Sequence, residues 1–423
     1  MIASFIKYRL NALMSRMGIG RLGRNALLST VGLGTRAVIQ AAYLIVLSHW
    51  MGPKDYGLFA GSVAAAILIA PISGWGISAV LTQWVARNQA KSRSLWATAI
   101  LQVVLSGVIL VIVLVLAAEL ILVDRVSIGS MLMLGFAELI ALPLAQVATS
   151  MCLALDRGAS AALSMCLVPA FRLGAVVTSM LMSVQGTPSH VAALHFFGSV
   201  LGVLAAVLLM ARIDGVPAWR ERISLREAMF SGTHFAIGAL VGTSYQEVDK
   251  VLLLQLLGAT VVGTYTAAFR VMSVFVLPIS ALVGAALPRL FAMHGKPQGP
   301  HMLKIISLSA IGYALIASLA AACVSPFMQR IFGAGFAMSS RYLLMLSPWA
   351  IVFALHQSAA TGLTAWEGQP KRVLVEALGI ALVIGLNLLL LPPLGAGAAA
   401  LSLLITEVFM ASGCWFFLQQ QPR

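Results

Sequence analysis

The chain has 423 residues, of which 60% are hydrophobic and only 9% charged, and its mean hydropathy is +0.98. A water-soluble domain carries charge on about a quarter of its residues, so the composition excludes a soluble globular protein and indicates a polytopic membrane protein. The net charge of +14 does not indicate nucleic-acid binding, because the basic residues lie mostly in short connections between apolar stretches, as in the cytoplasmic loops of membrane proteins.

The chain begins with a segment, residues 1–24, in which cationic and apolar side chains alternate. The cationic residues are Lys7, Arg9, Arg16, Arg21 and Arg24. We interpret the segment as a basic cytoplasmic tail that orients the first helix, with an amphipathic helix on the membrane surface as the alternative. The first apolar stretch begins only near Asn25 and contains Arg36, so we expect a retained helix and not a cleaved signal peptide.

Twelve apolar stretches follow, most of them near or above the roughly 20 residues with which a helix crosses the hydrocarbon core of a bilayer. They cover residues 25–48, 57–82, 95–118, 127–150, 159–183, 190–211, 230–256, 262–290, 303–325, 340–364, 373–391 and 395–417. Pro71, Pro143, Pro169 and Pro278 lie inside stretches and predict bends, which membrane helices tolerate where neighbours satisfy the freed carbonyls. The prediction is an all-α membrane protein with about twelve transmembrane helices.

The distribution of lysine and arginine predicts the orientation. With the N-terminus in the cytoplasm, most of the 27 basic residues fall on the cytoplasmic side or within the stretches. The opposite side holds only Lys54, Arg125, Arg330 and Arg341. Because cytoplasmic loops are enriched in basic residues, we expect both termini to be cytoplasmic.

The two halves of the chain resemble each other in the order of their turn residues. Gly52 and Gly57 recur as Gly258 and Gly263, and Pro-Ile-Ser at 71–73 recurs at 278–280. This near-constant spacing predicts two six-helix lobes related as parallel repeats, with a substrate path between them. The predicted division is a lobe at 25–211, a cytoplasmic linker at 212–229, a second lobe at 230–417 and a cytoplasmic tail at 418–423.

Eight charged residues lie deep inside the apolar stretches, where each costs about 2.5–3.5 kcal/mol on insertion scales. The cations are Arg36, Arg172, Lys250 and Arg270, and the acids are Glu138, Glu247, Asp249 and Glu407. Their charges sum to zero, which favours internal pairing.

Sequence distance from the turns predicts which of these charges meet. Glu138 and Arg172 are equally far from the turn between the fourth and fifth stretches, and Asp249 and Arg270 from the turn between the seventh and eighth. Antiparallel neighbours at equal depth can form ion pairs, so we expect both pairs. For each, a structural and a functional role stay open.

Short spacing along one helix predicts two further pairs. Glu247 and Lys250 are three residues apart, and Arg372 and Glu376 are four apart, so the members of each pair share a helix face.

Arg36 and Glu407 have no such partner in sequence. The depth of Arg36 matches Ala70 and Pro71 of the second stretch, and neither is acidic, so we expect Arg36 to contact an anionic substrate. Glu407 either titrates, pairs with Arg36, or is a hydrogen-bonded neutral acid; we favour the last two.

Other motifs give little support to an enzyme. The chain lacks a G-x-x-x-x-G-K-[ST] phosphate-binding loop, has no long outer loop for a catalytic site, and spaces its seven histidines without a metal-binding pattern. The four cysteines lie singly in apolar stretches and predict no disulfide or metal site. We therefore expect no enzyme activity, metal or cofactor.

Two segments resemble a known family. Residues 48–77, SHWMGPKDYGLFAGSVAAAILIAPISGWGI, are similar to the first hairpin of bacterial polysaccharide flippases in the multidrug/oligosaccharidyl-lipid/polysaccharide (MOP) exporter superfamily. The stretch that begins at Tyr245 resembles the start of their second lobe, with Asp249, Gly258, Gly263, Tyr265 and Ala268 at the matching positions.

The resemblance implies a MOP/MATE-like fold and the transfer of a polyprenyl-diphosphate-linked oligosaccharide to the outer leaflet for O-antigen, capsule or exopolysaccharide. It implies that Arg36, Lys250, Arg270 and, less directly, Arg172 face a central cleft, where guanidinium groups suit a diphosphate. The family couples transport to an ion gradient, for which Asp249, Glu247 and Glu138, together with Glu407 from the charge analysis, are the candidate residues in this chain. The expected site is the bacterial inner membrane, and the expected partners are membrane lipids, a polysaccharide polymerase and export proteins, without nucleic acid.

Two alternatives remain. A cation-coupled multidrug exporter of the same superfamily would share the fold, but the central Arg36 disfavours an organic cation. A non-transporting membrane partner of a polysaccharide synthase would have little docking surface in such short loops.

Overall fold

The computed structural model describes residues 21–121, 126–293 and 295–421. The predicted N-terminal segment 1–24 therefore lies almost entirely outside the described residues, as does Arg125. The first half contains α2 (Arg21–Ile69), α3 (Ile77–Arg87), α4 (Ser92–Ile121), α5 (Ile128–Phe136), α6 (Leu142–Ala154), α7 (Gly158–Leu181) and α8 (Pro188–Asp214). The second half contains α9 (Leu225–Ser244), α10 (Val248–Leu256), α11 (Ala259–Ala292), α12 (Gln298–Val324), α13 (Met328–Phe332), α14 (Ala337–Leu346), α15 (Trp349–Ala365), α16 (Gln369–Leu394) and α17 (Gly397–Gln419).

Every regular element in the described part of the chain is helical, so the prediction of an all-α membrane protein is confirmed. Among the described residues, nine helical units are long and apolar enough to cross a membrane, or ten if the bent pair α14–α15 is one span. Two features reduce the predicted twelve to ten. The first unit, 45 residues long, contains two predicted spans joined across a non-helical turn at Gly52, and the predicted span 230–256 is broken into α9 and α10 and is not among the candidates.

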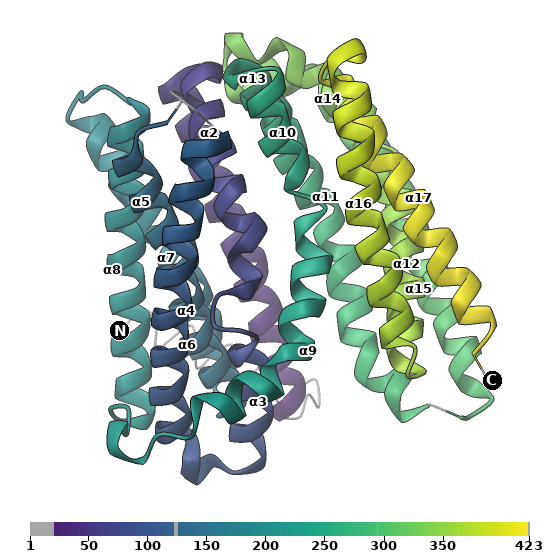
Figure 1. Ribbon diagram of the computed structural model, residues 1–423. Coiled ribbons are helices and arrows are strands. Elements are labelled where there is room, and N and C mark those ends of the chain that lie inside the picture. Colours follow the sequence, from purple (N-terminus) through teal and green to yellow (C-terminus); the bar gives the residue numbers. More distant parts are fainter. Residues whose placement is uncertain (1–20, 122–125, 294, 422–423) are drawn as a thin grey trace.

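The helices form two bundles that lie side by side (Figure 1). Helices α2 to α8 form one bundle, in which α7 packs against α2 and α8, and α12 and α15 to α17 form most of the other. The bundles meet mainly where α2 packs against α11 and α10. The predicted lobe boundaries, including the linker 212–229, stay a prediction.

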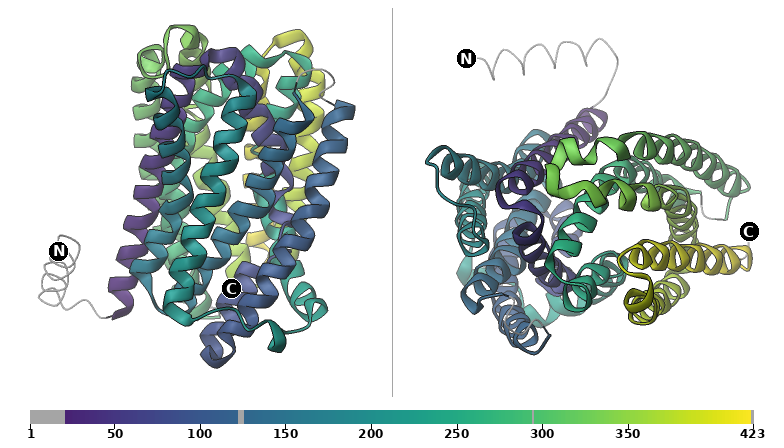
Figure 2. Two further views of the ribbon diagram at one scale, coloured as in Figure 1. Left: turned by 90° about the vertical axis from the view of Figure 1, so that its left-hand side faces the viewer. Right: turned by 90° about the horizontal axis from the view of Figure 1, so that it is seen from above.

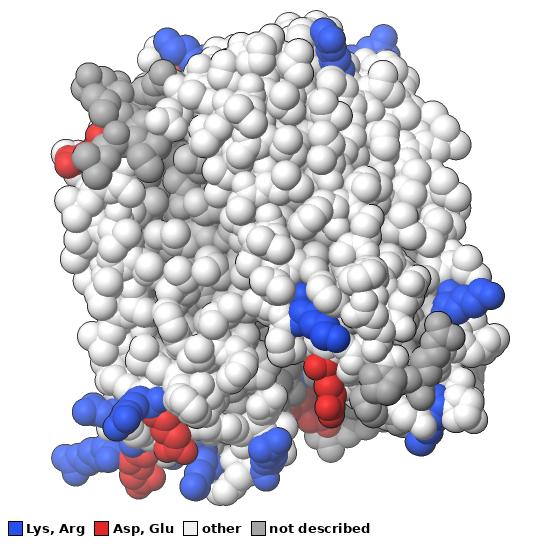
Figure 3. All heavy atoms as spheres, turned by 45° about the vertical axis from the view of Figure 1, so that its right-hand side comes forward, with Lys and Arg blue, Asp and Glu red and all other residues white. Residues whose placement is uncertain are grey.

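The described chain starts and finishes at the same end of the molecule. Arg21, where α2 begins, and Gln419, where α17 ends, both lie at the lower end in Figures 1 and 2. On the face drawn in Figure 3, basic side chains gather at this end, and a broad band across the middle is nearly free of charge. This arrangement agrees with an even number of crossings between Arg21 and Gln419, and with an apolar belt that contacts lipid.

Glycines allow the two bundles to approach closely at the upper end. A Cβ atom on Gly57 would lie 1.8 Å from the carbonyl oxygen of Ala259, and one on Gly263 would lie 2.0 Å from that of Pro53. The turn glycines before them share a left-handed backbone, with φ/ψ of 72°/173° at Gly52 and 91°/172° at Gly258. Gly57 and Gly263, which match in sequence, therefore form one crossing of α2 and α11, and each follows a matching turn glycine.

A second close contact joins the bundles at the lower end. A Cβ atom on Gly232 of α9 would lie 2.0 Å from the carbonyl oxygen of Trp75, and the indole of Trp75 donates to Thr233 at 3.0 Å. Trp75 lies in the turn before α3, where it and Gly76 adopt φ of 46° and 75°. Pro71 begins this interruption, so the bend predicted there is confirmed as a break between α2 and α3.

Candidate substrate and coupling sites

The first buried polar group, here called the N-bundle cluster, contains Glu138, Arg172, His195 and Tyr43. Arg172 Nη2 lies 2.9 Å from Glu138 Oε1, and their side chains are 9% and 3% exposed. His195 Nε2 lies 2.7 Å from the same oxygen, and Tyr43 OH lies 2.8 Å from His195 Nδ1. The predicted Glu138–Arg172 pair is confirmed. It is also part of a larger network that reaches α2 and α8.

The local backbone gives Glu138 an uncommon position. It lies in a π-helical turn, Ala137–Ala141, between α5 and α6, with all five residues of the turn buried. Such turns inside helices occur often at functional sites. Opposite it, Arg172 also donates through Nε to Ser199 Oγ at 2.8 Å, which fixes the plane of the guanidinium.

Arg36 lies on α2 beside this network and differs from it in having no acid of its own. It is partly exposed, and the charges that act on it most strongly are those of Arg172 and Glu138. No ion pair or hydrogen bond joins the Arg36 side chain to another described residue. Because Arg172 already neutralises Glu138, the N-bundle cluster and Arg36 together carry one excess positive charge.

The second group, here called the joint cluster, surrounds the break between α9 and α10. It contains Glu247, Asp249, Lys250, Tyr265 and Arg270. Arg270 donates to both oxygens of Glu247, at 3.1 and 3.3 Å, and Lys250 Nζ lies 3.7 Å from Glu247 Oε2. Asp249 accepts from Lys250 Nζ at 2.9 Å and from Tyr265 OH at 2.7 Å. The joint cluster contains two acids and two cations and is neutral overall.

One predicted pair in this cluster is wrong. Arg270 pairs with Glu247 and not with Asp249, which pairs with Lys250 instead. Sequence distance from the turn does not fix the direction of a side chain around the helix axis. Glu247 lies before the first turn of α10, outside the regular helix, and from there it reaches Arg270. The predicted Glu247–Lys250 contact is confirmed.

The third group, here called the Glu407 cluster, is in the second bundle. Tyr245 OH donates to Glu407 Oε1 at 2.6 Å, and the Trp349 indole donates to the same oxygen at 3.1 Å. His356 Nδ1 lies 2.8 Å from Glu407 Oε2. Glu407 thus pairs with no arginine or lysine in the described chain, and the alternative pair with Arg36 is wrong. The predicted hydrogen bonds to Glu407 are present, whereas its predicted neutral state stays a prediction.

Glu376 extends this cluster toward the lower end of the bundle. Glu376 Oε1 accepts from Arg372 Nε at 2.7 Å, which confirms the predicted local pair, and lies 3.6 Å from His356 Nε2. The Arg372 side chain is 23% exposed, whereas Glu376 and His356 are each 1% exposed. The cluster therefore runs from a half-open end at Arg372 to a buried acid at Glu407.

Sequence reasoning missed the buried histidines and tyrosines that complete the three clusters. These residues are His195, His356, Tyr43, Tyr245 and Tyr265. The histidines have no metal-ligand spacing, but any polar side chain deep in an apolar stretch requires a partner. His195 and His356 each lie deep inside an apolar stretch, and this position was the signal that could have predicted a buried polar partner for them.

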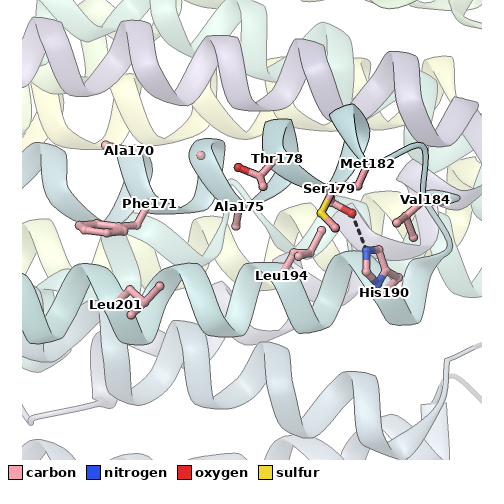
Figure 4. A pocket seen from close by; sticks show the side chains of 11 residues that line it. Ala170, Phe171, Ala175, Thr178, Ser179, Met182, Val184, His190, Leu194 and Leu201 are labelled. Atoms are coloured by element: carbon pink, nitrogen blue, oxygen red, sulfur yellow. Dashed lines mark hydrogen bonds between the residues drawn. The ribbon is translucent and has the colours of Figure 1, made fainter.

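A hollow of about 710 Å³ lies apart from these clusters, between α7 and α8 (Figure 4). Its walls are almost entirely apolar. At one end Ser179 Oγ lies 2.8 Å from His190 Nε2, marked by the dashed line in Figure 4. It contains none of the predicted site residues.

Comparisons with solved structures show the fold. An inward-facing multidrug resistance MATE family transporter of the MOP superfamily superposes with a TM-score of 0.72 at 13% identity, over 93% of this chain and 97% of the other. An outward-facing conformation of such a transporter gives 0.68 at 13% identity, over 95% and 94%. A MOP superfamily transporter from Pyrococcus furiosus, whose structure is described as having a binding pocket of reverse polarity, gives 0.67 at 14% identity, over 95% of both chains.

Sequence comparisons show the family. No curated protein sequence matches the chain significantly. Residues 22–294, well over half of the chain, match the family model described as polysaccharide biosynthesis protein. The chain therefore belongs to the polysaccharide biosynthesis protein family.

Proposed function

We propose that the protein is a flippase that moves a polyprenyl-diphosphate-linked oligosaccharide across a bacterial cytoplasmic membrane, from the inner to the outer leaflet, for surface polysaccharide biosynthesis. The family supports a role in polysaccharide biosynthesis, and the shared fold supports transport by alternating access between two bundles. Both termini would be cytoplasmic, and a polymerase and export proteins would act on the product.

The observation that carries the proposal is the state of Arg36. A guanidinium inside a membrane protein is costly unless it is paired or lines a polar path. Arg36 has no acidic partner among the described residues, is partly exposed, and lies beside a pair that is already neutral. Its five donors match the oxygens of a diphosphate in a bidentate geometry. Arg270, 25% exposed and shared with Glu247, is the second proposed substrate contact.

The remaining cations suit this role less well. Lys250 is fully buried against Asp249, and its Nζ lies 3.4 Å from the centroid of the Phe269 ring. Arg172 is held by Glu138 and Ser199. Among the proposed coupling acids, Glu138, Glu247 and Asp249 each have a cation partner, whereas Glu407 has hydrogen bonds alone. A proton or sodium gradient as the energy source is part of the proposal.

The test is the pool of lipid-linked sugar in cells that lack the protein. We expect polyprenyl-diphosphate-linked oligosaccharide to accumulate, and its mass identifies the sugar. A wild-type copy and an Arg341→Ala copy, which changes an exposed cation, should clear the pool. An Arg36→Ala copy of equal membrane abundance should not. Clearance by Arg36→Ala would remove this residue from the mechanism, and a normal pool in the deletion strain would refute the flippase.

Multidrug export is the second candidate, favoured by the likeness to a multidrug resistance MATE family transporter. That likeness, at 13% identity, is one of fold. An exporter of organic cations would be expected to lower ethidium accumulation, so higher ethidium in the deletion strain, together with a normal lipid-linked pool, would favour this function. Cells unchanged in both would favour a non-transporting partner of a synthase.

A further inference from the structure

The Glu407 cluster contains polar atoms without partners, although it is almost completely buried. His356 Nε2 and Glu376 Oε2 form no hydrogen bond, and both side chains are 1% exposed. Buried polar groups in native proteins nearly always have a partner. These two atoms belong to neighbouring residues, since His356 Nε2 lies 3.6 Å from the other oxygen of Glu376. A small cationic ligand between them would satisfy the histidine.

The hydrogen bonds around Glu407 identify this ligand. Tyr245 OH and the Trp349 indole both donate to Oε1, and an indole N–H can only donate. With Glu407 ionised, Oε2 can only accept, so His356 donates its Nδ1 proton to Oε2 at 2.8 Å. In this tautomer the lone pair of Nε2 points toward Glu376. We propose that His356 binds a proton at Nε2, between Glu407 and Glu376.

The proton balance is simple. With His356 neutral, the two carboxylates and Arg372 give the cluster a net charge of −1. Addition of one proton to the Nε2 lone pair gives an imidazolium with an N–H toward each carboxylate and a net charge of zero. The other titratable groups that face the site are Tyr245, from the α9–α10 break, and the Cys414 thiol of α17. In a medium of low dielectric constant, the neutral state is strongly preferred over an isolated charge.

The proposed proton site is connected to the lower end of the molecule on one side and to the contact between the two bundles on the other. Arg372, partly exposed in the first turn of α16, provides the outer end, and Gly368 just before this helix lies close to Gln421 at the lower end of the molecule. At the inner end, Glu407 holds Tyr245 in the break between α9 and α10. The neighbouring Ser244 donates to the carbonyl of Leu68 in α2, in the other bundle, at 2.9 Å.

This position gives the proton a mechanical effect. A carboxylate with no counter-charge accepts a strong hydrogen bond from Tyr245. When His356 is protonated, Glu407 is compensated, the bond to Tyr245 weakens, and the α9–α10 break is freed to move against α2. Proton occupancy would thus select between conformations of the two bundles. This coupling step rests on the proposed transport function, whereas proton binding at His356 does not.

The first experiment measures the proton directly. Protein labelled with ¹⁵N-histidine is placed in lipid nanodiscs, and the imidazole signals are followed with pH. His356→Gln assigns the signal of interest, and His301→Gln, at an exposed histidine, assigns a reference. We expect the His356 signal to show two protonated nitrogens at about pH 7.5, where an exposed histidine of pKa about 6.5 is mostly neutral. In Glu376→Gln, which keeps His356, the protonated fraction of His356 at this pH should fall toward that of the exposed reference histidine.

A neutral His356 signal throughout the range in which the protein stays folded would overturn the proposal. If His356→Gln does not fold, the His356 signal is identified as the one that shifts in Glu376→Gln. A spectrum of Glu376→Gln without any shifted imidazole signal would also overturn the proposal.

The second experiment tests the coupling. Vesicles with the purified protein receive a fluorescent polyprenyl-diphosphate sugar, with and without a pH gradient. We expect the gradient to stimulate wild type and His301→Gln, and His356→Gln to lose the stimulation while it retains exchange without a gradient. Stimulation of His356→Gln equal to that of wild type would refute the coupling. No transport by wild type would refute the proposed function and the coupling step, and the ¹⁵N measurement of proton binding would stand independently.

Discussion

Removal of Arg172 tests whether the N-bundle cluster is a balanced ion pair. Arg172→Met leaves Glu138, 3% exposed, without its strongest partner. Loss of one member of a buried pair costs about 3–5 kcal/mol, because a buried charge is left uncompensated. His195 still lies 2.7 Å from Glu138 and supplies one donor, so we expect the lower part of this range, about 3 kcal/mol, in the free energy of unfolding.

The double variant Glu138→Gln/Arg172→Met provides the decisive comparison. It removes both charges, so we expect it to be more stable than Arg172→Met alone and within about 1–2 kcal/mol of wild type. Unfolding by a denaturing detergent in mixed micelles gives the free energies. Arg212→Met, at an exposed site on α8, should change stability by no more than about 0.5 kcal/mol. A double variant as unstable as the sum of the two single variants would refute the charge-pair explanation.

Two further predictions concern the bundle crossing and the orientation. Gly263→Ala places a Cβ atom 2.0 Å from the Pro53 carbonyl oxygen, so we expect about 1–3 kcal/mol of destabilisation in the same unfolding assay. Gly284→Ala, with no atom within 4 Å of its Cβ, should have little effect. Equal destabilisation by the two substitutions would contradict the close crossing at Gly263. Single cysteines at the exposed positions of Lys54 and Arg157, in an otherwise cysteine-free chain, should react with an impermeant maleimide from outside and from inside respectively, and the reverse labelling would overturn the predicted orientation.

The sequence was sufficient for features that depend on position along one helix or on depth in the membrane. Hydropathy predicted the all-α architecture, i,i+4 spacing predicted Arg372–Glu376, and equal depth predicted Glu138–Arg172. Depth is a one-dimensional quantity, and the turn between two antiparallel helices fixes it well.

The sequence was insufficient where the rotation of a helix decides the contact. Asp249 and Arg270 are about equally far in sequence from the turn that joins their stretches, but the break at 245–247 turns Glu247 toward Arg270. The partners of Glu407 come from α15 and from this same break, far away in sequence, so no local spacing brings them together.

The position of the glycine crossing has a consequence for the size of any movement. Gly263 is near the start of α11, and at 1.5 Å per residue Ala292 lies about 44 Å farther along the helix. If α11 turns as a rigid rod about this crossing, a rotation of about 10° displaces its far end by roughly 8 Å while the crossing itself stays nearly fixed. The crossing would then be the pivot of α11, with a short segment of the helix before it and a long segment after it. The largest displacement of α11 would occur at the lower end of the molecule, where Gly232 packs against Trp75. That contact would then hold the two bundles together at this end until it breaks.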